Sequence, residues 1–248
     1  MSLISVIMPY YKKELYVKKS LESVLNQSYQ NLEIILINDE AESGNDIFLN
    51  EICKLDNRIK LITNDKNLGA GESRNKAIKI AKGEYIAFCD CDDLWSKFKL
   101  EDQLNFMKKF DIDFSFTAYQ IIDKEGKIIG SRSAKDNISF DELILSCDIG
   151  LSTVMLKKKL FNNKNFYFPN IKTKEDYVVW LKLSQNGVKM KGIKKNYSYW
   201  RKLGNSLSSS PIQKIFDGYK VYNFYLNYSV IKSMFRLIIL SINSILKK

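Results

Sequence analysis

Histidine is absent from this chain, and cysteine, proline and glycine are all scarce. Without histidine, zinc would need cysteine and carboxylate ligands, and the cysteines at 53, 89, 91 and 147 have neither metal-binding nor disulfide spacing. We therefore expect no zinc centre and a reducing compartment. Only 3 prolines and 11 glycines in 248 residues argue against long disordered linkers.

The sequence also shows neither a secretory leader nor a clear membrane span. A strand pattern begins at residue 3, so we expect no leader and a cytoplasmic protein. The tail, 229–248, is too interrupted by Lys, Arg, Ser and Asn to supply the roughly 20 apolar residues of a span. Its one apolar helical face with basic edges fits a helix lying on an anionic membrane, at the inner face of the cytoplasmic membrane. A helix packed on the body or on a partner subunit fits equally well.

The charge balance points to an acidic partner. The net charge is +11, while the hydrophobic share of 45% and the charged share of 27% are those of an ordinary folded protein. Nucleic acid, an anionic membrane or a phosphorylated substrate would each suit this charge. Because the lysines are spread along the chain and no basic stripe is interleaved with aromatic residues, we expect no nucleic-acid binding.

Strand and helix patterns alternate through the first ninety residues. Short apolar, β-rich runs are followed by segments whose apolar residues recur with helical spacing, which predicts a parallel, doubly wound α/β sheet with right-handed crossovers. The pattern then becomes mixed, with a hairpin around residues 123–126. The expected strands are 3–8, 32–37, 58–63, 85–89, 114–122, 127–132, 152–156 and 188–199, and the expected helices are 15–27, 46–54, 71–81, 97–109 and 174–185.

An apolar strand stops abruptly at three carboxylates, Asp90, Asp92 and Asp93. Open α/β sheets bind ligands at the carboxyl ends of their strands. Carboxylates this close repel one another unless a cation neutralises them, and Mg²⁺ and Mn²⁺ prefer oxygen ligands. Asp92 or Asp93 could instead cap the helix that starts near residue 96, but a cap leaves Asp90 unexplained.

Six segments, in this order, resemble the inverting family 2 glycosyltransferases of bacterial surface-polysaccharide or lipooligosaccharide synthesis. The segments are 5–11, 23–27, 33–39, 67–75, 90–93 and 175–176. The resemblance spans about residues 3–208 and implies a GT-A fold, a Rossmann-like, mainly parallel sheet with helices on both faces. It also implies a nucleotide-diphosphate sugar donor, most simply a UDP-sugar, and Mn²⁺ or Mg²⁺. The expected organisation is a GT-A domain at 1–210, with a nucleotide-sugar half at 1–95 and an acceptor half at 96–210, then a helical tail at 211–248.

The resemblance also assigns donor-binding residues. Asp39 is expected to accept a hydrogen bond from the uracil N3, and Pro9 and Tyr11 to line the base pocket. Arg74 follows small residues that let backbone approach a ligand, and its guanidinium is expected to reach phosphate. Asp90 is expected to contact the ribose or the hydration shell of the metal.

Asp92 is the expected metal ligand, with Asp93 in support. The resemblance makes Asp176 the general base, with Glu175 in support. Inversion needs one such carboxylate to take the proton of the acceptor hydroxyl. The pair Glu175 and Asp176 also suits ordinary capping of the helix that follows. Trp180 could shape the acceptor site, although the core is the more usual place for a tryptophan.

The segment 199–208 resembles the C-terminal active-site loop of the family, which often carries a metal-binding histidine. Leu203 stands in that place, so Arg201, Lys202 or water would have to supply the contact, with Ser206 in support. Asn38 likewise replaces an acidic residue common in the family.

The leading hypothesis is therefore an inverting, metal-dependent transferase that acts on a saccharide or a lipid-linked saccharide. A sugar nucleotidyltransferase is a second reading, but the segment after the first strand lacks the glycines of a triphosphate loop. A non-catalytic module that binds sugar nucleotides or a membrane surface is the third.

Overall fold

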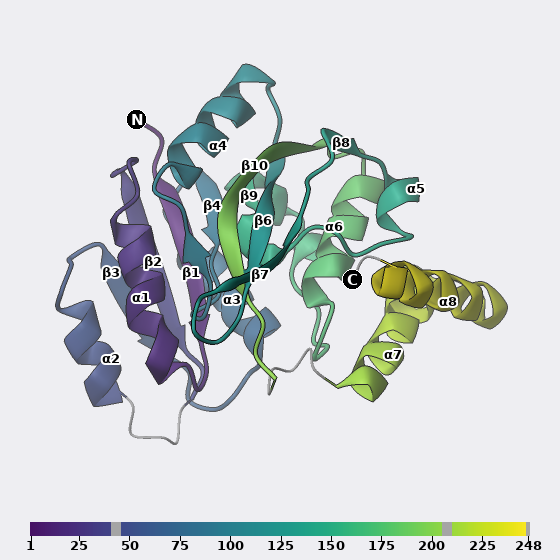
Figure 1. Cartoon of the computed structure of the whole chain (residues 1–248), viewed down its shortest axis with the longest axis horizontal. Helices are drawn as coiled ribbons and strands as arrows, with labels where there is room; N and C mark the ends of the chain where they lie inside the picture. Colours follow the sequence, from purple (N-terminus) through teal and green to yellow (C-terminus); the bar gives the residue numbers. More distant parts are fainter. Residues whose placement is uncertain (41–45, 205–209, 247–248) are drawn as a thin grey trace.

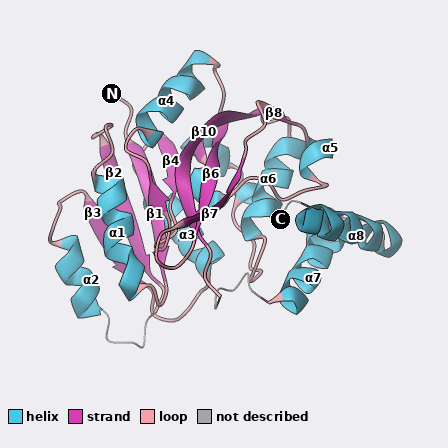
Figure 2. Ribbon diagram, viewed as in Figure 1, coloured by secondary structure: helices cyan, strands magenta, loops and turns pink. Residues whose placement is uncertain are grey.

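The computed structural model describes residues 1–40, 46–204 and 210–246. One mixed sheet runs through its centre, with helices on both faces (Figures 1 and 2). The strand order is β3-β2-β1-β4-β9-β6-β10-β5, with β7 paired to β6 and β8 paired to β10. The expected α/β architecture is therefore present.

The first half of the sheet is parallel, as the alternating pattern predicts. Its strands are β1 (Ile4–Tyr10), β2 (Leu32–Asn38), β3 (Ile59–Thr63) and β4 (Tyr85–Phe88). They are joined through α1 (Glu14–Leu25), α2 (Asp46–Cys53) and α3 (Ala70–Ile80). The chain adds β2 and β3 on one side of β1 and then returns through α3 to place β4 on the other. This reversal between β1 and β4 is the point at which doubly wound sheets bind ligands.

The second half mixes strand directions. Strand β9 is antiparallel to both β4 and β6, whereas β10 is parallel to β6. The hairpin expected around residues 123–126 is confirmed, since β6 and β7 pair antiparallel. The elements are β5 (Leu94–Trp95), α4 (Lys99–Lys109), β6 (Phe114–Ile122), β7 (Ile128–Arg132), β8 (Asn137–Ile138), α5 (Phe140–Leu143), β9 (Met155–Lys157), α6 (Glu175–Gln185) and β10 (Met190–Arg201).

One expected strand is shorter than its sequence pattern. We expected a strand over 152–156, but Leu151–Thr153 forms a 3-10 turn and β9 begins only at Met155. The turn is held by the Thr153 amide and hydroxyl, which both donate to the Gly150 carbonyl. Local hydroxyl bonding of this kind competes with strand pairing. The turn places the Ser152 side chain at the sheet edge.

The core lies on both faces of the sheet. Side chains alternate along a strand, so Ile7 of β1 packs toward α3 and α6, while Val6 and Met8 pack toward α1, α2 and α4. A strand covered on both faces reads as an unbroken apolar run. Such runs are what the sequence shows at β1, β2 and β4, and they fix these strands in the centre.

Two more helices follow β10 in the chain (Figure 1). They are α7 (Pro211–Lys220) and α8 (Val230–Leu246), joined through a π-helical turn at Val221–Tyr225. Ser210 caps α7, and Gly218 gives Leu237 of α8 the room to approach closely. Among the residues described, no helix combines the length and apolar content that crossing a membrane requires.

Candidate active site

Polar residues follow the carboxyl ends of four neighbouring parallel strands. In register, Tyr10 of β1 lies beside Asn38 of β2, which lies beside Thr63 of β3. Asp39 and Asn64 are therefore neighbours at this edge, and the acidic run begins just beyond the end of β4. The sequence placed Asp39 and the acidic run at strand ends, and the structure brings them to one edge of the sheet together with Asn64.

Asp39 anchors the loop that leads into α3. One carboxylate oxygen accepts hydrogen bonds from the Leu68 amide and the Asn64 side chain, and the other accepts from the Gly69 amide, each at 2.8 Å. Gly69 has φ +82°, a left-handed conformation that suits glycine. Asp39 is only 2% exposed, so its expected uracil contact would have to use lone pairs left over from these bonds. That contact stays a prediction.

Arg74 on α3 joins the two acidic segments that the sequence singled out. Its guanidinium donates to the Asp90 carboxylate at 2.8 Å and to the Glu175 carboxylate at 2.6 Å. The arginine side chain is only 4% exposed, and it lies 5.5 Å from the centre of the Phe168 ring. Charge-assisted pairs of this kind fix geometry strongly when they are buried. Arg74 therefore sets the position of α6 relative to the end of β4.

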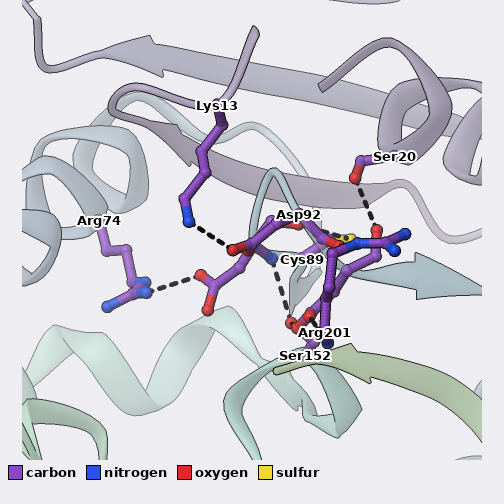
Figure 3. Close-up of polar contacts among 9 residues, drawn as sticks. Lys13, Ser20, Arg74, Cys89, Asp92, Ser152 and Arg201 are labelled. Carbon is purple, nitrogen blue, oxygen red and sulfur yellow. Dashed lines mark hydrogen bonds and ion pairs between the residues drawn. The ribbon is translucent and has the colours of Figure 1, made fainter. Parts of the chain in front are cut away.

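Asp92 is paired with a lysine that the sequence did not single out. The Lys13 ammonium lies 2.6 Å from an Asp92 carboxylate oxygen. Figure 3 shows Lys13 reaching the acidic run on the same side as Arg74. Burial raises the pKa of the Asp92 carboxyl, the charge of Asp90 raises it further, and Lys13 opposes both effects. The site thus favours a positive charge beside Asp92.

Asp93 shapes the turn and is buried away from solvent. It is 1% exposed, and its oxygens accept from the Arg201 amide at 2.9 Å and the Ser152 hydroxyl at 2.5 Å. The same Ser152 hydroxyl accepts from the Asp90 amide at 3.1 Å. Burial, then the charges of Asp92 and Asp90, raise the pKa of the Asp93 carboxyl well above its usual range. Its support for the site is therefore indirect, through the backbone of the acidic run.

Arg201 holds backbone and does not take the role considered for it. It was one of three groups, with Lys202 and water, that could contact the metal or the diphosphate in place of the missing histidine. Its guanidinium instead donates to the carbonyls of Asp92, Asp123 and Lys124 at 2.9 to 3.1 Å. It is 6% exposed and lies 4.8 Å from the centre of the Tyr16 ring. An arginine is suited to this task because its planar fork bonds several oxygens at once. It ties the acidic run to the β6–β7 turn. Figure 3 shows Arg201 beside the acidic run.

Asp176 lies in the first turn of α6, beside the Glu175 that pairs with Arg74. It is partly exposed, and its carboxylate accepts from the Tyr177 amide at 2.7 Å. Burial raises the pKa of Asp176 to about 7, with the Glu175 charge adding to the shift and Arg74 opposing it. A carboxylate that titrates near neutral pH suits a general base.

Trp180 does not reach the site, and its expected support role is wrong. It is fully buried between the sheet and α6, with ring centroids 4.9 Å from Phe114 and 6.2 Å from Phe168. It is a core tryptophan, which was the more usual reading of this residue. Pro9 and Tyr11 lie at the end of β1, and Tyr11 is exposed, as a base pocket would need. Ser206 lies outside the described residues.

The donor set fits a hard divalent cation that also binds substrate. Within residues 1–40, 46–204 and 210–246, no three His, Cys, Asp or Glu side chains gather closely enough to hold a metal by themselves. Mg²⁺ at phosphate sites needs only one or two protein carboxylates, because phosphate and water supply the rest. Asp92, with Asp90 nearby, meets that requirement, and the Lys13 contact marks where positive charge is stabilised.

The comparisons with known proteins agree with this geometry. A family model described as "Glycosyl transferase family 2" matches residues 5–181. The chain belongs to glycosyl transferase family 2. The Escherichia coli protein WfgD, named as a UDP-Glc:alpha-D-GlcNAc-diphosphoundecaprenol beta-1,3-glucosyltransferase, is 36% identical over 214 residues, covering 86% of this glycosyltransferase and 82% of WfgD.

Solved structures show the same fold. S. aureus TarS in complex with UDP-GlcNAc superposes with a TM-score of 0.73 at 23% identity, over 96% of this chain and 70% of the other. The mannosyltransferase PcManGT from Pyrobaculum calidifontis, in complex with GDP-Man and Mn²⁺, gives 0.72 at 12% identity, over 94% and 69%. The expected GT-A fold of this family 2 glycosyltransferase is confirmed.

Beside the acidic run, Lys13 and Ser152 were missed in the sequence. Lys13 follows β1 by three positions, so its place at the carboxyl edge was readable, although its pairing with Asp92 was not. Ser152 lies in a segment where we expected a strand, and nothing in the local sequence marks its side chain as part of the site. Its role comes from contacts with residues about sixty positions away.

Proposed function

We propose that this glycosyltransferase moves a sugar with inversion from a UDP-sugar to a lipid-linked saccharide, with Asp176 as the general base. The observation that carries the proposal is the buried bridge from Asp90 through Arg74 to Glu175. That bridge holds the first turn of α6, with the Asp176 carboxylate of pKa about 7, beside the acidic run that follows β4. The UDP donor and lipid-linked acceptor are supported by WfgD, whose name specifies both.

The reaction needs one displacement. Asp176 takes the proton of the acceptor hydroxyl, whose oxygen forms a bond to the anomeric carbon of the donor. The bond from that carbon to the diphosphate oxygen breaks, and its electron pair leaves with the diphosphate. Attack on the face opposite the leaving group inverts the anomeric centre, so no covalent enzyme intermediate is required.

Asp92 would hold a Mn²⁺ or Mg²⁺ ion, with Asp90 beside it. When bound, such an ion neutralises the negative charge of the departing diphosphate. Lys13 and Arg74 bring cationic groups to the same carboxylates, so this edge of the sheet is arranged for a phosphate-bearing substrate. Asp93 and Arg201 hold the backbone of the acidic run and so keep these groups in position.

The assay that tests this function is nucleoside diphosphate release. We expect UDP release from the right UDP-sugar in the presence of acceptor and Mn²⁺, and loss of that release on adding a chelator. Release of pyrophosphate would instead identify a nucleotidyltransferase. Donor binding without metal-dependent UDP release under any acceptor condition would identify a binding module and contradict the proposal.

The pH profile offers a second test. Because the base works in its ionised form, kcat/KM should rise as pH increases through about 7 and level off above it. Glu175→Gln removes a charge that raises the pKa of Asp176, so the rise should move to lower pH. Measurement of kcat/KM from pH 5 to pH 9 would show this shift, and an unchanged midpoint in Glu175→Gln would contradict the assignment.

A further inference from the structure

Helices α7 and α8 turn large apolar side chains toward solvent. Phe216 of α7 is 63% exposed, and Phe235 of α8 is 62% exposed. The other exposed apolar residues of this C-terminal segment are Ile212, Ile215, Phe224, Val230, Ile231, Met234, Ile238, Ile242, Ile245 and Leu246. Soluble proteins rarely expose large apolar patches, and the patches that they do expose often mark interaction sites.

The orientation of α8 on the body explains why its apolar residues are exposed. Ser233, Leu237, Leu240 and Asn243 recur at helical spacing on the side that faces the body, and the Asn243 amide donates to the Leu145 carbonyl at 2.8 Å. Surface helices normally turn their apolar face to the core. Here the inner face includes small and polar residues, and much of the apolar surface points outward.

The charges on this segment are all of one sign where they meet solvent. Residues 210–246 contain four basic residues, Lys214, Lys220, Lys232 and Arg236, and a single acidic residue, Asp217. Asp217 is 1% exposed, so it contributes no surface carboxylate. Within 210–246, the charges that meet solvent are therefore all cationic.

We infer that α7, the π-helical turn and α8 together form a docking surface for an anionic membrane. An apolar face with basic residues beside it is the composition of interfacial membrane helices, and the lipid headgroups supply the missing negative charge. A second copy of the chain would instead bring the same cationic groups against each other, which disfavours association. The surface is larger than the tail helix alone, because α7 and Phe224 are part of it.

The docking surface is tied to the base-bearing helix. One Asp217 oxygen accepts from the Thr173 amide and hydroxyl, both at 2.9 Å, and from the Gln213 side chain at 3.0 Å. Thr173 lies three residues before Asp176. The contact therefore links α7 to the start of α6. The inference rests on the proposed function in one respect: a lipid-linked acceptor would be met at the surface that these helices contact.

Vesicle flotation of the full chain tests the inference without donor or acceptor, so its outcome is independent of the transfer assay. We expect binding to vesicles of phosphatidylcholine and phosphatidylglycerol at 3:1. The double substitution Phe235→Ser and Ile238→Ser should weaken this binding at least about tenfold, because each side chain loses apolar contact with lipid. The matched control is Ile47→Ser with Leu55→Ser, two exposed apolar residues near α2, which should bind as the unmodified chain does.

The charge contribution is tested separately. Lys220→Gln with Lys232→Gln should weaken binding to the anionic vesicles by about 25-fold, since each basic residue near such a membrane contributes about fivefold. Binding to vesicles of phosphatidylcholine alone should be weak and little changed by these substitutions. Failure of the unmodified chain to float with anionic vesicles would overturn the inference. So would a stable dimer that Phe235→Ser with Ile238→Ser converts to monomer while vesicle binding is unaffected.

Discussion

Asp176→Asn should lower kcat for sugar transfer by about 10²- to 10⁴-fold, the usual contribution of a positioned general base. The amide that replaces the carboxylate has nearly the same shape but cannot take the acceptor proton. Because Asp176 forms no ion pair among the described contacts, the Arg74 bridge to Glu175 and Asp90 should persist. Donor affinity, measured by calorimetry with the UDP-sugar and Mn²⁺, should therefore stay close to that of the unmodified enzyme.

The matched control is Asp141→Asn. Asp141 also occupies the second position of a helix, α5, but it is exposed and no site contact includes it. Its substitution should leave both kcat and donor affinity unchanged. If Asp176→Asn kept near-normal turnover, Asp176 would not be the base. If both variants lost activity equally, a general loss of folding would explain the result.

Much of the fold was predictable because its signals are local. The apolar runs of β1, β2 and β4 are buried on both faces, and each is followed by a helical pattern, so their parallel direction follows from the sequence. The position of Asp90 at the carboxyl edge needed only the end of one strand. These inferences depend on neighbours within a few residues, and they survived in the structure.

The roles of individual side chains were less predictable because they depend on distant contacts. Arg201 was one of three candidates for a ligand contact, and it instead holds the Asp92 carbonyl from 109 positions away along the chain. Trp180 is a residue type that suits either a pocket or a core. Only the packing of α6 on the sheet shows that it belongs to the core. Lys13 is near in sequence to β1, but its partner Asp92 is 79 residues away.

Arg74→Met should destabilise the fold and abolish transfer together. Removing the guanidinium leaves the Asp90 and Glu175 carboxylates without their cation, and breaking a buried pair in this way costs about 3 kcal/mol in the free energy of unfolding. Denaturant unfolding should show this loss. Arg58→Met is the control, because Arg58 pairs with the nearby Asp56 in a more exposed setting and should cost no more than about 1 kcal/mol.

Arg74→Lys separates stability from positioning. A lysine keeps the charge but cannot present two N–H groups to two carboxylates in one plane, so it should recover part of the stability and little of the activity. Since Arg74 lowers the pKa of Asp176, its loss in Arg74→Met should move the rise in kcat/KM to higher pH, provided residual activity is measurable. Glu175→Gln should move the rise the opposite way. Shifts in the same direction for both variants would show that the Arg74 bridge does not control the base.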